Sequence, residues 1–155
     1  MRNVFKILTV LALMTASACE RLIVDWAPVN VYIQATDNDG NSIISDDMPG
    51  MSVTFKGETY TVQPAPKTYL ATMEGLIAEK NHAGEYYLRF GEIDGAADMD
   101  EDLVLRWPDG SMDTIHYHCS DHKARRNPTC NRYWKLNGVD HDGAVFVFTG
   151  KSLAK

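Results

Sequence analysis

The segment LVLRWPDGSMDTIHYH, residues 103–118, carries the clearest fold signal in the sequence. LVLRW and DTIHYH are strand-forming runs, because β-branched and aromatic side chains pack well on a pleated sheet. Between them, Pro108 presets the first backbone angle of a turn and Gly110 accepts a positive φ. The segment therefore predicts a β-hairpin.

The same alternation of strand-like runs and turn residues continues on both sides of this hairpin. In residues 29–36, VNVYIQAT, apolar and polar side chains alternate with the period of two that a half-buried strand requires. Residues 67–84 lack this period, and Gly75 interrupts a roughly helical spacing there, so we expect an irregular segment with room for one short helix. Further strand-like runs are MSVTFKG (51–57), TYTV (59–62), EYYLRFGEI (85–93), RYWKLNG (132–138) and AVFVFTG (144–150).

These runs together predict an all-β domain. They give about seven to eight strands, with a turn signal about every ten residues, which is the pattern of a β-sandwich. No repeat and no low-complexity tract interrupts the pattern. We expect one domain over residues 29–155, because a chain of this length has enough residues for one core and too few for two.

The first nineteen residues have the form of a processing signal. Arg2 and Lys6 precede an apolar stretch at 7–14, which is too short to cross a bilayer. Small residues at 15–18 then lead to Cys19, in a register that resembles the bacterial lipobox. That resemblance implies cleavage after residue 18 and attachment of acyl chains, such as palmitate, to Cys19. The alternatives are a plain cleavable signal and an uncleaved N-terminal helix.

The expected mature chain begins with a short tether at 19–28. Removing residues 1–18 takes away Arg2 and Lys6, so the formal net charge changes from −6 to −8. Such an acidic chain is unsuited to nucleic acid and to electrostatic binding of anionic lipid. The membrane would therefore be held through the acyl chains, since two such chains give stable anchoring.

Two cysteines remain after the expected anchor, Cys119 and Cys130. In a chain exported from the cytoplasm, an intramolecular disulfide is the default for such a pair. It would close a short loop and stabilise the fold by about 3 kcal/mol on a chain-entropy estimate. Metal ligation by the two thiolates is the alternative.

Two groups of side chains have the chemistry of metal ligands. The acidic loop IDGAADMDED offers carboxylates that could surround calcium, although Asp and Gly are also ordinary turn residues. His116 and His118 lie two apart, so on a strand they share one face, as zinc ligands on a sheet do. The alternative for both histidines is a solvent-facing position without metal. The carboxylates in question belong to Asp94, Asp98, Asp100 and Asp102.

A basic group at Lys123, Arg125 and Arg126 stands out on the acidic domain. It could dock an acidic partner or a glycan, and the alternative is a solvated loop. The sequence contains no nucleophile elbow, HExxH helix or phosphate-binding loop. We therefore expect a protein that is not an enzyme and that needs no cofactor.

Several motifs occur in an order that resembles a known group of proteins. The lipobox is followed by WAPV at 26–29, by a strand ending in DNDGN at 37–41, and by the WPDGSMDTI hairpin. This order resembles the small cell-envelope lipoproteins of gut Bacteroidetes, many of which have immunoglobulin-like domains. The resemblance implies an immunoglobulin-like sandwich at the outer membrane or cell surface. In the tether that follows Cys19, Glu20 and Asp25 are the only acidic residues, so the periplasmic and exterior faces both stay open.

These features together predict a membrane-anchored envelope lipoprotein that acts as a binding or structural module. Its expected partners are the membrane and either an envelope protein or a glycan. One alternative is a periplasmic or surface hydrolase, or a metal-dependent enzyme, that uses the acidic loop or the histidines. Another is an adhesin or pilus-like assembly subunit, which would pair an exposed sheet edge with another chain.

Overall fold

The computed structural model of the chain describes residues 28–66, 75–95, 98–120 and 131–153. Within these ranges the protein contains ten strands and no helix. The strands are β1 (Pro28–Ala35), β2 (Ser52–Phe55), β3 (Glu58–Pro64), β4 (Leu76–Lys80), β5 (Tyr86–Asp94), β6 (Met99–Arg106), β7 (Met112–Ser120), β8 (Asn131–Leu136), β9 (Val139–His141) and β10 (Val145–Phe148).

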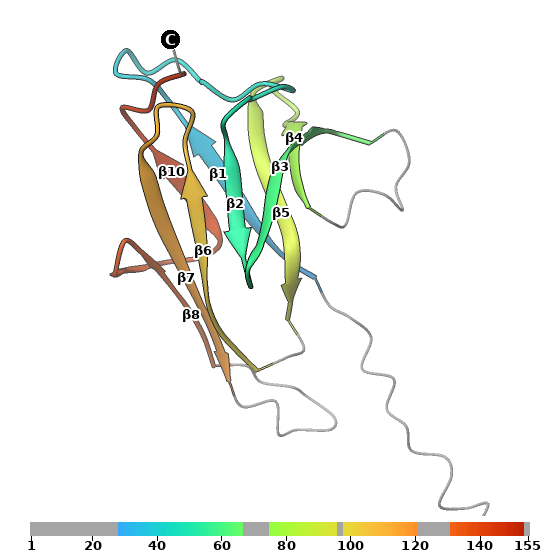
Figure 1. The fold of residues 1–155 in the computed structure, drawn as a ribbon, viewed down its shortest axis with the longest axis vertical. Helices are drawn as coiled ribbons and strands as arrows, with labels where there is room; N and C mark the ends of the chain where they lie inside the picture. Colours follow the sequence, from blue (N-terminus) through green and yellow to red (C-terminus); the bar gives the residue numbers. More distant parts are fainter. Residues whose placement is uncertain (1–27, 67–74, 96–97, 121–130, 154–155) are drawn as a thin grey trace, which may run out of the picture.

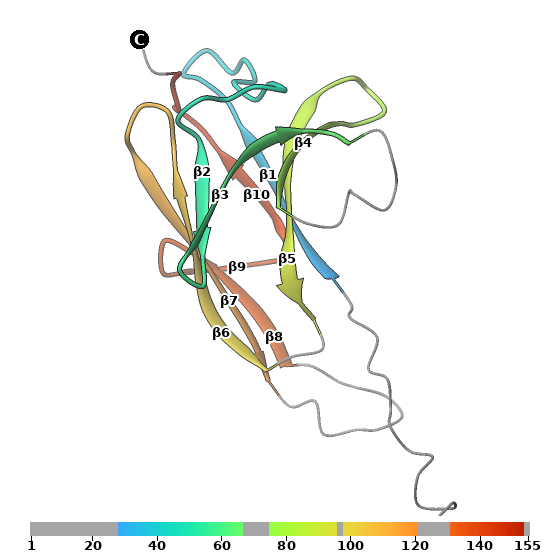
Figure 2. The same cartoon turned by 45° about the vertical axis from the view of Figure 1, so that its right-hand side comes forward.

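The strands form one continuous ladder that folds into two layers (Figure 1). Its order is β10-β1-β5-β4-β3-β2-β6-β7-β8-β9. The first layer contains β10, β1, β5 and β4, and the second contains β2, β6, β7, β8 and β9. β3 joins them, because residues 58–61 pair with β2 while residues 62–64 pair with β4. Figure 2 shows β3 crossing from the second layer, beside β2, to the first layer, beside β4.

On the opposite side, the chain changes layer again between β9 and β10. The ring of His141, at the end of β9, stacks on the ring of Phe146 in β10, with centroids 4.3 Å apart. Strands that switch sheets are how sandwiches build their corners. The chain thus changes layer on both sides of the core.

The core lies between the layers, and in strands such as β1 it follows from the period of two. Val31 and Ile33 of β1 are fully buried. From the other layer, Phe55 meets Phe90 of β5 edge to face, with ring centroids 5.6 Å apart. Each such side chain contributes about 1.5–3 kcal/mol by leaving water. Hydrophobic burial is therefore the main force that holds the layers together.

The hairpin predicted at 103–118 is confirmed. β6 and β7 pair antiparallel, with Arg106 opposite Met112. In the connecting turn, the backbone N–H of Trp107 donates to the carbonyl of Ser111 at 2.9 Å, and Gly110 has a φ of 85°. That backbone angle is the one for which glycine was expected.

The prediction of an all-β sandwich is also confirmed, although the number of strands is ten rather than about eight. The expectation of an irregular segment was wrong for residues 76–80, which form β4 between β3 and β5. Consecutive apolar residues, Leu76 to Ala78, suit a strand covered on both faces, so the period of two is absent. β6 also begins at Met99, four residues earlier than the run LVLRW indicated.

The predicted signal segment and the tether up to residue 27 lie outside the described residues. Where the chain is described, it includes no helix of the length and apolarity that crossing a bilayer requires.

Candidate binding face

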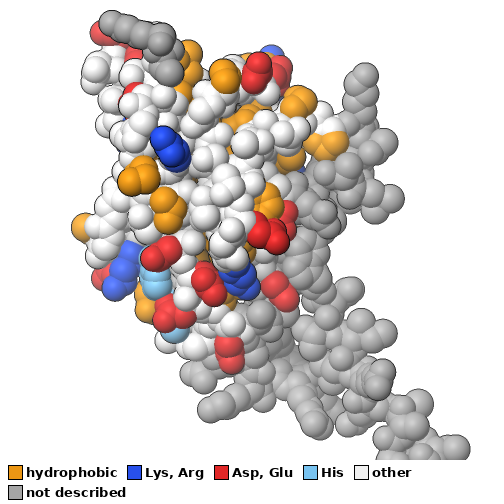
Figure 3. Space-filling view, in the orientation of Figure 1, with side chains coloured by type: hydrophobic (Ala, Val, Ile, Leu, Met, Phe, Trp, Pro, Cys, Tyr) orange, Lys and Arg blue, Asp and Glu red, His pale blue; other side chains and the backbone are white. Residues whose placement is uncertain are grey.

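The structure brings four of the predicted site residues together on adjacent strands. Asp100 and Asp102 of β6 lie directly opposite His118 and His116 of β7. All four side chains are on the outer face of the second layer, because their neighbours in the strands, such as Leu103, point into the core. In the space-filling view, histidine and acidic side chains gather over the lower part of this face (Figure 3).

The two histidines are held by the two carboxylates. His116 places Nδ1 2.9 Å from Asp102 Oδ1 and Nε2 3.1 Å from Asp100 Oδ1. His118 Nδ1 lies 3.3 Å from the same oxygen of Asp100. A neutral imidazole has a single N–H to donate, whereas an imidazolium donates from both nitrogens. The rings are thereby fixed in orientation, while the carboxylates stay largely open to solvent.

β8 adds an aromatic ring and a cation to this group. Tyr133 lies opposite His118, and the two rings stack at 4.6 Å with an interplanar angle of 14°. Lys135 lies opposite His116 and holds its Nζ 5.6 Å from the centroid of the Tyr133 ring. We call the whole group the His–Asp face; it consists of Asp100, Asp102, His116, His118, Tyr133 and Lys135.

The sequence analysis did not select Tyr133 or Lys135. Their strand, RYWKLNG, was expected, but its register against DTIHYH was not assigned. The signal lies in the alternation of both runs: Trp134 and Tyr117 are buried, so Tyr133 must share the outer face with His116 and His118.

The predicted metal ligands do not all belong to this face. Asp94 ends β5 in the first layer, opposite Pro28, whereas Asp98 directly precedes β6. Across the described residues, no group of three or more His, Cys, Asp or Glu side chains is arranged to hold a metal ion. The observed histidine contacts are hydrogen-bonding distances to carboxylates.

The face also differs from a nucleophile–base pair. In a hydrolase of that type, one histidine nitrogen is oriented by a carboxylate and the other accepts a proton from a serine or cysteine. Here both nitrogens of His116 face carboxylate oxygens. The arrangement offers hydrogen-bond acceptors and a ring surface.

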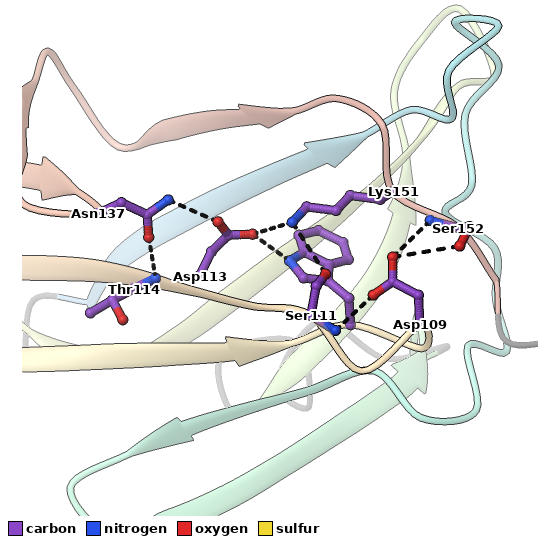
Figure 4. Close-up of polar contacts among 8 residues, drawn as sticks. Asp109, Ser111, Asp113, Thr114, Asn137, Lys151 and Ser152 are labelled. Carbon is purple, nitrogen blue, oxygen red and sulfur yellow. Dashed lines mark hydrogen bonds and ion pairs between the residues drawn. The ribbon is translucent and has the colours of Figure 1, made fainter.

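A second polar cluster lies where the hairpin meets the C-terminal segment, and we call it the hairpin latch (Figure 4). Asp113 Oδ2 is 2.6 Å from Lys151 Nζ and accepts a 2.7 Å hydrogen bond from Trp107 Nε1. Asn137 Nδ2 donates to the other oxygen of Asp113 at 2.8 Å. The Asn137 side chain in turn accepts from the backbone N–H of Thr114 at 2.9 Å. The latch thus joins the hairpin, the β8–β9 turn and the chain after β10.

Asp113 is a charged group in a mostly buried place. Burial raises the pKa of its carboxyl, but hydrogen bonds from Lys151, Asn137 and Trp107 outweigh that effect and the pKa is lowered. Its side chain is 11% exposed and that of Lys151 is 14% exposed, with the Lys151 Nζ 5.2 Å above the Trp107 ring. Every strong acceptor and donor is matched, so the hairpin latch is a structural cluster rather than an open site.

A third cluster lies on the outer face of the first layer. Arg89 Nε is 2.9 Å from Glu79 Oε1, and the hydroxyl of Tyr87 donates to Glu79 Oε2 at 2.8 Å. Arg89 Nη1 also donates to Asn30 Oδ1 at 3.3 Å. Burial, together with the bond to Glu79, raises the pKa of Tyr87 to about 12. This cluster connects β1, β4 and β5.

Several predicted site residues lie outside the described residues: Cys19, Cys130, Lys123, Arg125 and Arg126. Cys119 is described, and it is buried near the end of β7. Ser120, which follows it, pairs with Asn131 at the start of β8.

Comparisons of the chain with protein-family models, with curated proteins and with solved structures found no match. The geometry of the described residues therefore carries the functional argument.

Proposed function

We propose that this protein is a lipoprotein of a bacterial envelope, at the outer membrane or cell surface, whose sandwich serves as a binding module. Cys19 would carry the lipid, and the His–Asp face would contact the ligand. The ligand class that best fits this face is a hydroxyl-rich molecule, that is, a glycan.

The anchor is supported by the arrangement of sequence and fold. The lipobox-like residues end at Cys19, and β1 begins at Pro28, so the difference, 28 − 19, is nine residues. A tether of nine residues spans at most about 30 Å when extended. The domain would therefore stay close to the lipid surface, with the start of β1 nearest to it.

The observation that carries the binding proposal is the ring of Tyr133. It is 39% exposed, although it stacks on His118, and the two histidines of β7 lie between it and the exposed carboxylates on β6. An aromatic ring offers a flat surface for the C–H groups of a sugar ring. Carboxylates accept hydrogen bonds and so can pair with neighbouring hydroxyls. The stacked histidine fixes the ring, which reduces the entropy lost on binding.

The binding proposal is tested by calorimetric titration of the domain with a panel of neutral oligosaccharides. We expect at least one to bind, and Tyr133→Ala to weaken that binding tenfold or more, by about 1.4 kcal/mol. Arg106→Ala is the matched control, because Arg106 is exposed on the same strand as Asp100 but outside the His–Asp face. Binding that is equally reduced by both substitutions, or by neither, would contradict the proposal.

The anchor is tested separately in the natural host. The intact mass of membrane-extracted protein should correspond to a chain that starts at Cys19 and carries acyl chains. Cys19→Ala should release the protein from the membrane fraction. An unmodified thiol at Cys19, or a retained leader, would refute lipidation without affecting the glycan test.

We also propose that Cys119 and Cys130 form a disulfide. The support is positional: Cys119 is buried near the end of β7, and Cys130 directly precedes the first residue of β8 in the sequence. β7 and β8 pair up to Ser120 and Asn131, so the two cysteines flank the connection between paired strands.

A further inference from the structure

The ladder has two ends, and they differ in a way that points to a partner. Among the described residues, β10 is the last strand at one end and pairs only with β1, in parallel. Within the same residues, β9 is the last strand at the other end and pairs only with β8. An exposed strand edge offers unpaired backbone groups to another strand unless something blocks it.

The hydrogen bonds between β1 and β10 show which backbone groups are left over. Tyr32 N–H donates to the carbonyl of Ala144 at 2.8 Å, and Thr36 N–H donates to the carbonyl of Phe148 at 2.9 Å. Backbone groups of successive residues point to opposite edges of a strand, so those of residues 144, 146 and 148 face β1. The N–H and C=O groups of Val145 and Val147 therefore point away from β1, toward the free edge.

The side chains at this edge do nothing to block it. Val145 is 51% exposed and Val147 is 55% exposed. Residues 144–149, AVFVFT, include no charge and no proline. β9, in contrast, has only three residues and carries the charged Asp140 at its centre. A charge is one of the usual protections of an edge; both strands are short, but β9 carries this protection and β10 does not.

We propose that the free edge of β10 pairs with β10 of a second copy of this chain, in antiparallel orientation. Val145 of each copy would lie opposite Val147 of the other, so each of these pairs exchanges two backbone hydrogen bonds. A two-fold axis between the two Phe146 residues relates the copies. The interface is isologous, because the same backbone groups of both copies form the hydrogen bonds. It uses the free β10 edge of each copy, so the assembly stops at a dimer.

The charge distribution directs a second copy to this edge rather than to the rest of the surface. The chain has a net charge of −6, so two copies repel each other over most of their surfaces. β10 is an uncharged segment where they can approach. In the proposed register, the nearest acid, Asp142, comes opposite Gly150 of the other copy rather than opposite another acid. The inference does not depend on the proposed glycan binding or on the lipid anchor.

The strand contact is small, so the free domain should dimerise weakly and in a concentration-dependent way. Tethering in a membrane would raise the local concentration and strengthen the contact. Sedimentation velocity of the soluble domain should give a weight-average mass that rises with concentration toward twice the monomer value. Val147→Lys should abolish the rise, because it places a like charge near the two-fold axis. Val139→Lys, the same change on the protected edge strand β9, should leave it intact.

Hydrogen exchange provides a second, residue-specific measurement. The amides of Val145 and Val147 should exchange quickly in dilute protein and become protected as the concentration rises. The amide of Phe146, which faces β1, should be protected at all concentrations. A monomer at every concentration, equal loss of dimer in both lysine variants, or unchanged exchange at Val145 and Val147 would each overturn the proposal. Thermal melts of the variants verify that both remain folded.

Discussion

Asp113 is a charged side chain whose removal should cost substantial stability. Asp113→Asn would leave the buried ammonium of Lys151 without a counter-charge, and such unpaired charges destabilise proteins by about 3 kcal/mol. Urea denaturation should show this loss as a lower midpoint with an unchanged slope. Asp142→Asn, at an exposed loop position, is the control and should change stability by less than about 0.5 kcal/mol. Equal effects of the two substitutions would contradict the structural role of the latch.

The same carboxyl should shape the acid limb of the stability curve. Its pKa is lowered in the folded state, so the unfolded state binds a proton first as the pH falls. Its stabilising contribution is present above the ordinary carboxyl pKa of about 3.9 and is lost as the pH drops through the lower, folded value. Asp113→Asn should therefore lose less stability than the wild type as the pH falls below about 4. Parallel acid limbs for the two proteins would be inconsistent with this account.

Tyr87 should act at the opposite end of the pH scale. Its pKa is raised to about 12, so the folded state holds its proton longer than the unfolded state, which loses it near 10. The contribution is present below pH of about 10 and declines as the pH rises through the folded value. Tyr87→Phe should flatten this alkaline decline and cost about 1 kcal/mol at neutral pH, because the bond to Glu79 is lost. Denaturation curves at neutral and alkaline pH test both parts.

Strands whose partners are close in sequence were the easiest elements to predict. The hairpin at 103–118 depends on its own turn, Pro108 to Ser111, so its local sequence is sufficient to predict it. β4 is an exception: it pairs with β5 across a short turn, but it was missed because its three apolar residues have no period of two and its parallel pairing with β3 leaves no turn signal. The start of β6 was missed because acidic residues such as Asp100 and Asp102 disfavour strands; pairing with β7 overrides that preference.

The candidate site was predicted in part for the same reason. His116 and His118 are two residues apart in a strand, so their position on one face can be predicted from the sequence alone. Their contacts to Asp100 and Asp102, and the stacking of Tyr133, need the registers of two strand pairs. The partner of Asp113, Lys151, could not be predicted because the contact forms only when the two layers close.

The connection between β7 and β8 should depend on the proposed Cys119–Cys130 bridge. Reduction should lower the stability by about 3 kcal/mol, since the unfolded chain gains the freedom of an open loop. Thiol alkylation under denaturing conditions, followed by mass measurement, should label neither cysteine before reduction and both after it. Cys130→Ala in reducing conditions should match the reduced wild type. Labelling of both cysteines without reduction would exclude the bridge.

The hairpin latch is the point at which distant parts of the whole molecule hold one another. Asp113 is the second residue of β7, and Lys151 follows β10, the last strand of the first layer. Their side chains point toward each other in Figure 4. The two residues are separated by 151 − 113, or 38, positions in the chain. A contact between residues this far apart in sequence stabilises the sandwich only after most of the strands are in place.

A double-mutant cycle measures that coupling. Lys151→Met keeps the aliphatic packing over Trp107 and Phe148 while removing the charge, so the single variant mainly exposes the cost of an unpaired Asp113. The double variant Asp113→Asn/Lys151→Met has neither charge and should be more stable than the sum of the single losses predicts, by about 2 kcal/mol. Additive losses would mean that the ion pair does not couple the C-terminal segment to the hairpin. The stability of the closed sandwich would then come from the apolar core and not from this ion pair.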